Sequence, residues 1–360
     1  MSRVAILGTG LIGGSIGFDL VARGREVVGF DRDPTAVRRA VDRGAVTTAA
    51  DGPADAVEGA ALVIAAVPPH DFGSVARGLA AHLAPDAVVT DVGSAKFDVV
   101  RAGEAALGAR FVGGHPMAGS ERHGIDGARP GLFEDAWWIL TPTATTSPGA
   151  YQQVAELAAS LGARPVALDA AEHDSLVARV SHLPQVVASA LVDLAVGDIP
   201  DDPRLRFAGG GFRDTTRIAA SDPDLWVSIA RANRAAIGRS IAALQERLGD
   251  VAGWLASADW EALRTFFERA RGARVELFDK PVYGGAPVTL QMLIPDRPGV
   301  LAEVTTAAGQ LGANIEDLRI MHSAEGGRGT LELVVPEGPH LARLVAVLED
   351  LGYDVDSSSS

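Results

Sequence analysis

The stretch that decides the fold is Val4-Ala5-Ile6-Leu7-Gly8-Thr9-Gly10-Leu11-Ile12-Gly13, a short apolar run followed by three regularly spaced glycines. The spacing is G-x-G-x-x-G, which between a strand and a helix is typical of a turn that binds a dinucleotide pyrophosphate. Gly8 permits the tight turn, Gly10 lets a phosphate approach the backbone, and Gly13 lets the helix pack close to the strand. The N-terminus of that helix offers free N–H groups to an anion. We therefore predict a dinucleotide site at this turn.

An acidic residue at the expected distance supports this prediction. A second apolar run, 26–30, leads into Asp31, which follows Gly10 by about twenty residues, where a Rossmann unit places the carboxylate that binds the adenosine ribose. This carboxylate repels a 2′-phosphate and favours NAD over NADP, although the adjacent Arg32 could serve such a phosphate. The alternative, a βαβ turn without a ligand, is disfavoured by the strand, spacing and acid together. The predicted cofactor-binding residues are Gly8, Gly10, Leu11, Ile12, Gly13, Asp31, Arg32, Val67, Pro68 and Ser94.

Composition limits the class of protein. The 360 residues suffice for two or three domains, and the net charge of −14 argues against general nucleic-acid binding. The chain has no cysteine, which excludes disulfides, thiolate metal sites and cysteine nucleophiles. The chain enters a core strand too early for a signal peptide, and its longest apolar run, 60–67, is too short to span a bilayer. We expect a cytoplasmic protein with no metal, nucleic acid or membrane partner.

The pattern along the chain predicts three domains. Strands and helices alternate to about residue 170, which indicates a doubly wound, mainly parallel α/β sheet of the Rossmann type. The ligand crevice should lie beyond the carboxyl ends of its strands. The predicted strands are 4–7, 27–30, 62–66, 88–90, 111–112, 138–140 and 164–168, and two of the predicted helices are 11–23 and 34–43.

Beyond residue 170 the strand pattern stops. Alanine-rich helices are predicted at 172–195, 222–247 and 260–278, and such helices often pack against a second subunit, so we expect a homodimer. A pattern of strand, helix, two strands, helix and strand then indicates a ferredoxin-like βαββαβ domain. The predicted limits are 1–170, 171–280, a linker at 281–287, 288–356, and a disordered tail at 357–360.

A polar cluster follows the predicted strand 111–112. It reads Gly113-Gly114-His115-Pro116-Met117-Ala118-Gly119-Ser120-Glu121, and we expect His115 at the strand end, facing the crevice. Imidazole suits a general base near neutral pH. Ser94 stands at the equivalent place on the neighbouring strand and could bind the same substrate oxygen. A turn histidine held by the backbone is the alternative, which the strand-end position and the glycines disfavour.

A second cluster lies in the helical region. Ser181-His182-Leu183-Pro184 interrupts a predicted helix, and Gly209-Gly210-Gly211 precedes Arg213 and Arg217, which are spaced to share one helical face. Guanidinium groups suit bidentate binding of a carboxylate. A solvated face paired with Asp214 or Asp222 explains the arginines about equally well.

Together these motifs resemble those of the prephenate dehydrogenase family, which includes arogenate and cyclohexadienyl dehydrogenases. The resemblance covers residues 1 to about 280, and the His-Pro-Met-Ala-Gly-Ser-Glu block is its most specific part. One departure is Gln185, where the family often has a second histidine. The matching segments are 8–15, 91–96, 114–121, 181–184, 209–217 and 221–226.

The resemblance implies NAD-dependent oxidative decarboxylation of prephenate to 4-hydroxyphenylpyruvate in tyrosine biosynthesis. It implies that His115 removes the proton of the ring hydroxyl, that Ser94 binds that hydroxyl, and that Arg217, with Arg213 nearby, binds a substrate carboxylate. Ser120, Glu121 and His182 resemble residues that line the substrate pocket. An arogenate or dual-specificity dehydrogenase, and a β-hydroxyacid dehydrogenase, are alternative enzymes. The latter class uses a lysine base that the predicted helix 172–195 lacks. An alternative of another kind is a silent sensor of NAD and amino acids.

The C-terminal region contains Asp296-Arg297-Pro298-Gly299-Val300-Leu301 between a predicted strand and helix, and Gly312-Ala313-Asn314-Ile315 further on. These segments resemble the recurrent loop and the second signature of an ACT domain, a module that binds amino acids. The resemblance implies feedback inhibition by tyrosine, and the alternative is a structural ACT unit without a ligand. Its predicted effector residues are Asp296, Arg297, Gly299, Val300, Leu301, Asn314 and Ile315.

Overall fold

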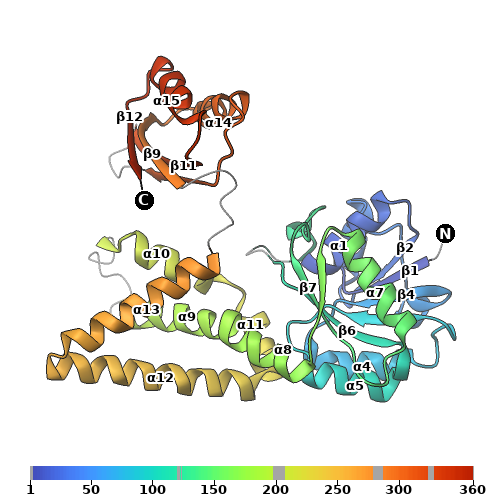
Figure 1. The fold of residues 1–360 in the computed structure, drawn as a ribbon. Helices are drawn as coiled ribbons and strands as arrows, with labels where there is room; N and C mark the ends of the chain where they lie inside the picture. Colours follow the sequence, from blue (N-terminus) through green and yellow to red (C-terminus); the bar gives the residue numbers. More distant parts are fainter. Residues whose placement is uncertain are drawn as a thin grey trace. The chain divides into compact units, whose positions relative to one another are not determined.

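The computed structural model describes residues 3–119, 122, 124–197, 207–278, 287–322 and 328–359. The chain divides into two compact units, Met1–Asp250 and Val251–Ser360. The first contains the α/β sheet and most of the helical region, and the second contains helix α13 and a small C-terminal sheet (Figure 1).

The first unit is built on an eight-stranded sheet in the order β3-β2-β1-β4-β5-β6-β7-β8. The strands β1 to β6 are parallel, whereas β7 runs antiparallel to β6 and is paired in parallel with β8. The strand order reverses between β1 and β4, which is where doubly wound sheets bind ligands. The Rossmann-type prediction is confirmed, although the short β3 was missed. The strands are β1 (Arg3–Leu7), β2 (Val27–Phe30), β3 (Thr48–Ala49), β4 (Ala60–Ala65), β5 (Val88–Asp91), β6 (Phe111–Pro116), β7 (Trp137–Thr141) and β8 (Arg164–Ala167).

Helices cover both faces of this sheet, so its central strands are apolar throughout. Successive side chains of a strand point to opposite faces. Val4 and Ile6 of β1 accordingly join one core, while Ala5 and Leu7 join the other. The first core includes α1 (Leu11–Ala22), α2 (Pro34–Asp42) and α7 (Pro148–Ser160), and the second includes α3 (Pro53–Val57), α4 (Pro69–Leu79) and α5 (Phe97–Leu107).

The helical region is more broken than predicted. The predicted helix 172–195 is α8 (Ala170–Val177), a π-helical turn at Ala178–His182 and α9 (Leu183–Val196). The predicted helix 222–247 is divided at Asn233 into α11 (Pro223–Ala232) and α12 (Arg234–Ser257). The other helices here are α10 (Gly210–Thr216), which continues into a 3₁₀ turn at Arg217–Ala220, and, in the second unit, α13 (Trp260–Phe278).

One helical run, Ala170–Val196, is long and apolar enough to cross a membrane when judged by length and composition alone. A helix that packs inside a soluble protein passes the same test, so this is weak support for a span. The run also contains the buried polar side chains of His173, Asp174 and His182.

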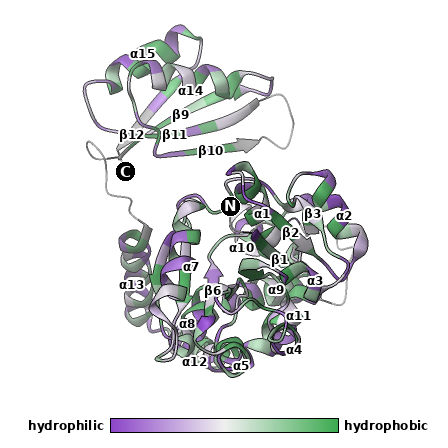
Figure 2. Cartoon of the chain, turned by 90° about the vertical axis from the view of Figure 1, so that its right-hand side faces the viewer, coloured by the Kyte–Doolittle hydropathy of each residue, from purple (hydrophilic) through white to green (hydrophobic). Residues whose placement is uncertain are grey.

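The C-terminal sheet is antiparallel in the order β10-β11-β9-β12, with both helices on one face (Figures 1 and 2). The predicted βαββαβ pattern is confirmed. The predicted tail is wrong for residues 357–359, which extend β12 and pair with β9, while residue 360 lies outside the described residues. The predicted linker, apart from residue 287, also lies outside them. The elements are β9 (Pro287–Pro295), α14 (Val300–Gln310), β10 (Asp317–His322), β11 (Arg328–Pro336), α15 (Leu341–Asp350) and β12 (Val355–Ser359).

Candidate active site

The glycine turn between β1 and α1 has the shape that its sequence predicts. Gly8 has a φ of +95°, and a Cβ there would lie 2.2 Å from the carbonyl oxygen of Ala66. A Cβ on Gly13 would lie 1.9 Å from the carbonyl oxygen of Gly8. Gly10 faces open space, since the nearest atom to a Cβ there would be Cα of Gly124 at 4.0 Å. No side chain caps α1 and no acidic residue occupies its first turn, so this end suits a phosphate.

A cleft of about 710 Å³ opens at the carboxyl ends of β1, β2 and β4. Asp31 lies at its edge, where one carboxylate oxygen accepts a hydrogen bond of 2.7 Å from the backbone N–H of Thr9. Of the predicted cofactor residues, Leu11, Ile12, Gly13 and Ser94 are not among those that line the cleft. The ones that do line it are Gly8, Gly10, Asp31, Arg32, Val67 and Pro68.

A buried lysine joins the ends of β5 and β6. Lys96 is fully buried, and its Nζ forms an ion pair with Asp91 and donates a hydrogen bond of 2.8 Å to the carbonyl oxygen of Gly114. Burial lowers the pKa of Lys96, and the charge of Asp91 partly offsets this. The carboxylate of Asp91 also accepts hydrogen bonds from the N–H groups of Gly93 and Gly114. These contacts fix the backbone immediately before His115.

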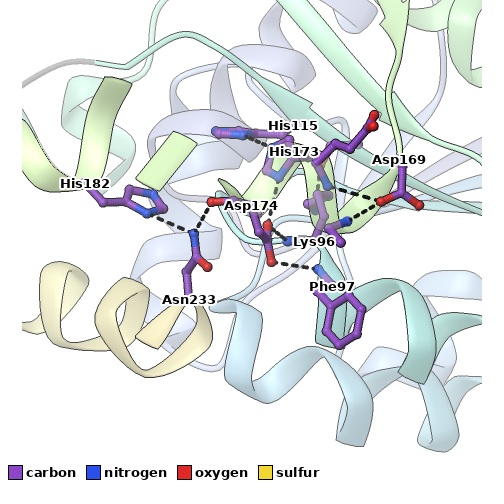
Figure 3. A network of polar contacts seen from close by, with 12 residues as sticks. Lys96, Phe97, His115, Asp169, His173, Asp174, His182 and Asn233 are labelled. Atoms are coloured by element: carbon purple, nitrogen blue, oxygen red, sulfur yellow. Dashed lines mark hydrogen bonds and ion pairs between the residues drawn. The ribbon is translucent and has the colours of Figure 1, made fainter. Parts of the chain in front are cut away.

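His115 itself is half-buried near the end of β6, where it pairs with Ile139 of β7. Its Nδ1 lies 2.8 Å from Nε2 of His173, and Nδ1 of His173 lies 2.8 Å from a carboxylate oxygen of Asp174 (Figure 3). Asp174 also accepts hydrogen bonds from the backbone N–H groups of Lys96, at 2.7 Å, and Phe97, at 2.9 Å. The structure thus connects α8 to the loop after β5 through these side chains.

The imidazole of His115 is neutral at neutral pH. Burial lowers its pKa well below 6.5, and the electrostatic effects of the neighbouring His173, Lys96 and His182 lower it further. A neutral imidazole has a nitrogen lone pair that can accept a proton. The arrangement therefore provides a base.

His182 lines a second, smaller cavity, of about 290 Å³, together with Gln185 and Trp226. Burial lowers the pKa of His182 to about 4. The amide of Asn233 donates to the carbonyl oxygen of Asp174 at 2.8 Å and lies 3.3 Å from Nδ1 of His182. The side-chain oxygen of Gln185 is buried without a hydrogen-bond partner, so a polar acceptor is available to a ligand beside His182.

In the described part of the chain, the other predicted catalytic and substrate-binding residues are not gathered around His115 and His182. Ser94 is half-buried in the loop after β5, and Arg213 and Arg217 are exposed, on α10 and on the 3₁₀ turn that follows it. Neither arginine lines either of these two cavities. Ser120 and Glu121 lie outside the described residues.

Sequence reasoning missed the roles of Lys96, His173 and Asp174. Lys96 stands in a segment singled out only for Ser94, and His173-Asp174 reads as ordinary polar residues in a helix. Charged residues on the apolar period of a helix could have indicated burial, because such groups are rarely buried without a partner. Among the described residues, no group of three or more histidines or acids is placed to hold a metal ion.

The C-terminal sheet has its own cavity, of about 260 Å³, in the loop between β9 and α14. Arg297 forms two hydrogen bonds of 3.0 Å to Glu303, which also accepts one of 2.7 Å from the hydroxyl of Tyr353. These bonds lower the pKa of Glu303. Asn314 and Ile315 are not among the lining residues. The predicted effector residues that line the cavity are Asp296, Arg297, Gly299, Val300 and Leu301.

Comparison with family models divides the chain in the same way. Residues 16–167 match the nucleotide-binding domain of prephenate dehydrogenase, and residues 169–269 match its dimerization domain. Residues 284–353 match the ACT domain.

Individual relatives agree with these matches. Prephenate dehydrogenase of Bacillus subtilis is 33% identical over 92% of this chain and 91% of its own. Cyclohexadienyl dehydrogenase of Zymomonas mobilis is 33% identical over 76% of this chain and 96% of its own.

Solved structures extend the likeness to three dimensions. Prephenate dehydrogenase of Aquifex aeolicus in complex with hydroxyphenyl propionate and NAD⁺ is 33% identical, with a TM-score of 0.72 over 77% of this chain and 98% of its own. Arogenate dehydrogenase of Synechocystis is 30% identical, with a TM-score of 0.67 over 76% of this chain and 99% of its own.

Proposed function

Since the chain belongs to the prephenate dehydrogenase family and is an NAD-dependent oxidoreductase, we propose that His115 is the base of its reaction. The observation that carries this proposal is a neutral, half-buried imidazole held at the end of β6 by the bond from its Nδ1 to His173. Its other nitrogen, Nε2, is left to receive a proton. The cleft at the carboxyl ends of β1, β2 and β4 and the glycine turn fit NAD, which would accept a hydride from the substrate when it is bound.

The chemistry on prephenate then requires little from the protein. His115 removes the proton of the ring hydroxyl while hydride leaves the same carbon, so that the C–O bond becomes a carbonyl. Loss of carbon dioxide breaks the bond to the ring carboxylate, and its electron pair makes the ring an aromatic phenolate, which is then protonated. The product is 4-hydroxyphenylpyruvate. The protein must supply a base, a carboxylate anchor and a fixed orientation.

The remaining substrate contacts are proposed from the motifs. Ser94 binds the ring hydroxyl, and Arg217, assisted by Arg213, binds a carboxylate. Their exposed guanidinium groups are free to reach a bound anion. His182, with Ser120 and Glu121, lines the pocket. The buried His182 and the unpartnered oxygen of Gln185 support a polar subsite there.

The test of this function is the rate of NADH formation with prephenate and, separately, with L-arogenate. Because prephenate and arogenate differ by a keto or an amino group, a single contact can decide between them, and activity on arogenate alone would favour the alternative substrate. Cofactor binding without turnover on either substrate would favour the silent sensor.

Replacing the proposed base provides the sharper measurement. We expect His115→Asn to lower kcat by about 10²–10⁴-fold with a smaller change in KM, as for loss of a general base. An increase in KM with kcat unchanged would contradict the assignment.

We also propose a cytoplasmic homodimer. Its support is the match to a dimerization domain and the exposed apolar side chains of α9 and α11 in that domain, since large exposed apolar surfaces mark interfaces. These side chains are Val186, Leu194, Leu225 and Val227.

For the ACT domain we propose feedback inhibition by tyrosine, the product of the pathway. The cavity at Asp296–Leu301 would receive the amino acid, and Arg297 is its nearest cationic group. Tyrosine titration of the NADH-forming rate tests this proposal.

A further inference from the structure

We propose that Asp174 and His173 form a hydrogen-bonded relay that holds the ring of His115 in the one tautomer that can act as a base. This inference rests on the proposed role of His115. Neither residue needs to touch the substrate, so both are positioning residues that act through His115.

The direction of the relay follows from the chemistry of its end group. A carboxylate only accepts hydrogen bonds, so the proton between His173 and Asp174 is on Nδ1 of His173. Neutral His173 then has a lone pair on Nε2, which accepts a hydrogen bond from Nδ1–H of His115, 2.8 Å away. His115 therefore carries its proton on Nδ1, and its Nε2 has the free lone pair.

The anchor of this relay is rigid. His173 is fully buried and Asp174 is 5% exposed. The two carboxylate oxygens of Asp174 accept from the backbone N–H groups of Lys96 and Phe97, and its carbonyl oxygen accepts from Asn233 (Figure 3). Because three elements hold Asp174, the carboxylate cannot turn away from His173. Burying a carboxylate costs stability unless its hydrogen bonds are satisfied, and here His173 and two backbone N–H groups satisfy them.

The relay also stabilises the protonated form of His115, which its surroundings otherwise disfavour. Burial, together with the electrostatic effects of His173, Lys96 and His182, lowers the pKa of His115 and so disfavours its protonated form. The imidazolium that forms keeps its Nδ1–H bond to His173, whose opposite nitrogen remains bound to the negative Asp174. The relay thereby stabilises the charge that the reaction creates.

Two variants break the relay at different points. In Asp174→Asn the amide can donate to Nδ1 of His173, which moves the proton of His173 to Nε2 and that of His115 to its own Nε2. His173→Leu removes the contact altogether. We expect each to lower kcat by about 10- to 10³-fold, while KM for NAD and for the substrate stays within about threefold, because an orienting partner is lost and the binding groups remain.

A conservative variant and a matched control separate positioning from packing. The side-chain oxygen of glutamine in His173→Gln can reach the position of Nε2 and accept from His115, so we expect it to recover about tenfold in kcat over His173→Leu. His340→Gln replaces a histidine that bonds only a backbone carbonyl, that of Pro336, among its described contacts, and should keep the wild-type rate. Equal rates for the Leu and Gln variants would overturn the relay.

The tautomer can be observed directly in the folded, full-length protein. With ¹⁵N-labelled histidine, the difference between wild type and His115→Asn identifies the ring signals of His115 among eight histidines. We expect a protonated Nδ1 and an unprotonated Nε2 in the wild type, and the reverse or a mixture in Asp174→Asn. A protonated Nε2 in the wild type would overturn the proposal, even if Asp174→Asn fails to fold.

The outcomes also distinguish this inference from the function beneath it. If His115→Asn keeps full activity, the proposed base fails and the relay has no reaction to serve. If His115→Asn is inactive while folded His173→Leu and Asp174→Asn turn over at the wild-type rate, only the relay fails.

Discussion

The lowered pKa of His115 has a measurable consequence for pH dependence. A base works only when unprotonated, and burial together with His173, Lys96 and His182 keeps His115 unprotonated to well below pH 6.5. We expect the acid limb of kcat/KM against pH to lie below pH 6.5 and to be lost together with activity in His115→Asn. An acid limb centred above pH 6.5 would contradict this environment for the base.

The lowered pKa of His115 also affects the stability of the fold, because the unfolded chain binds a proton there more readily than the folded one. Between its ordinary pKa of about 6.5 and its lower folded value, His115 binds a proton in the unfolded chain but not in the folded one. Stability is therefore lost as the pH falls through this range. His182, with a folded pKa of about 4, contributes in the same direction.

At the residue scale, we expect Asp31 to determine the preference for NAD over NADP. Its carboxylate lines the nucleotide cleft and accepts from Thr9, and the adjacent Arg32, which lines the same cleft, lies 3.7 Å from a carboxylate oxygen of Asp71. We expect Asp31→Ala to reduce the ratio of kcat/KM for NAD over NADP by about 10- to 100-fold, the size of one or two charge-assisted hydrogen bonds. An unaltered ratio, measured under matched conditions with both cofactors, would remove the ribose assignment.

The individual residues also show where sequence reasoning succeeds and where it stops. Gly8, Gly10 and Asp31 could be predicted because a local backbone geometry requires them at fixed spacing. His173 could not, because its partner His115 is 58 residues away in the chain and only the packing of α8 against α5 and β7 brings them together.

At the scale of elements, the junction of β5, β6 and β7 is the least tolerant part of the site. A Cβ on Gly114 would lie 2.8 Å from the carbonyl oxygen of Asp91 and 3.0 Å from Nε1 of Trp138. The strand pairs of β6 are parallel on one side and antiparallel on the other, so neither neighbour can move without disturbing the other. β5 pairs with residues 111–112 of β6 and β7 with residues 113–116, so the pairing with β7 holds the backbone at His115.

We therefore expect Gly114→Ala to lower the free energy of unfolding by about 1–3 kcal/mol and to lower kcat, because an overpacked strand shifts the adjacent histidine. Gly119→Ala is the matched control, since nothing lies within 4 Å of a Cβ there. Denaturant unfolding and steady-state rates measure both. Equal free energies of unfolding for the two variants would show that the strands adjust to the added methyl group and would contradict this prediction.

The helical elements mark the limit of prediction from periodicity. The apolar pattern of 172–195 correctly predicts helix, but it does not reveal the π-helical turn at Ala178–His182 that places His182. Such turns follow from one extra residue in the backbone hydrogen-bond ladder and are frequent at functional sites. Likewise, the alternation of strands and helices predicts the sheet but not the reversed direction of β7.

At the scale of the whole molecule, catalysis and regulation should be separable. The Zymomonas cyclohexadienyl dehydrogenase corresponds to 76% of this chain over 96% of its own length, so a relative of this family functions at that size. We expect a chain that ends at residue 278 to retain NADH formation and to lose inhibition by tyrosine. A matched full-length variant, Gly299→Ala, should also lose inhibition, because Gly299 has a φ of +95° at the wall of the ACT cavity.

Sensitivity of the truncated chain to tyrosine, measured against the full-length protein, would contradict the role of this domain. The proposed dimer is checked on the same samples by sedimentation, where we expect twice the mass of 37.2 kDa for the full-length chain.

The connection between β6 and β7 lies close to both the glycine turn and His115. The connection from β6 to β7 begins after Pro116, the residue that follows His115, and Gly124 within it lies beside Gly10. Arg43, which follows α2, binds the carbonyl oxygens of Ile125 and Ala128 in the same connection. A phosphate that settles on Gly10 and a molecule that approaches His115 therefore border the same length of chain. We therefore expect a substitution that shifts Gly124 to weaken NAD binding and to lower turnover together, because both depend on where this segment lies.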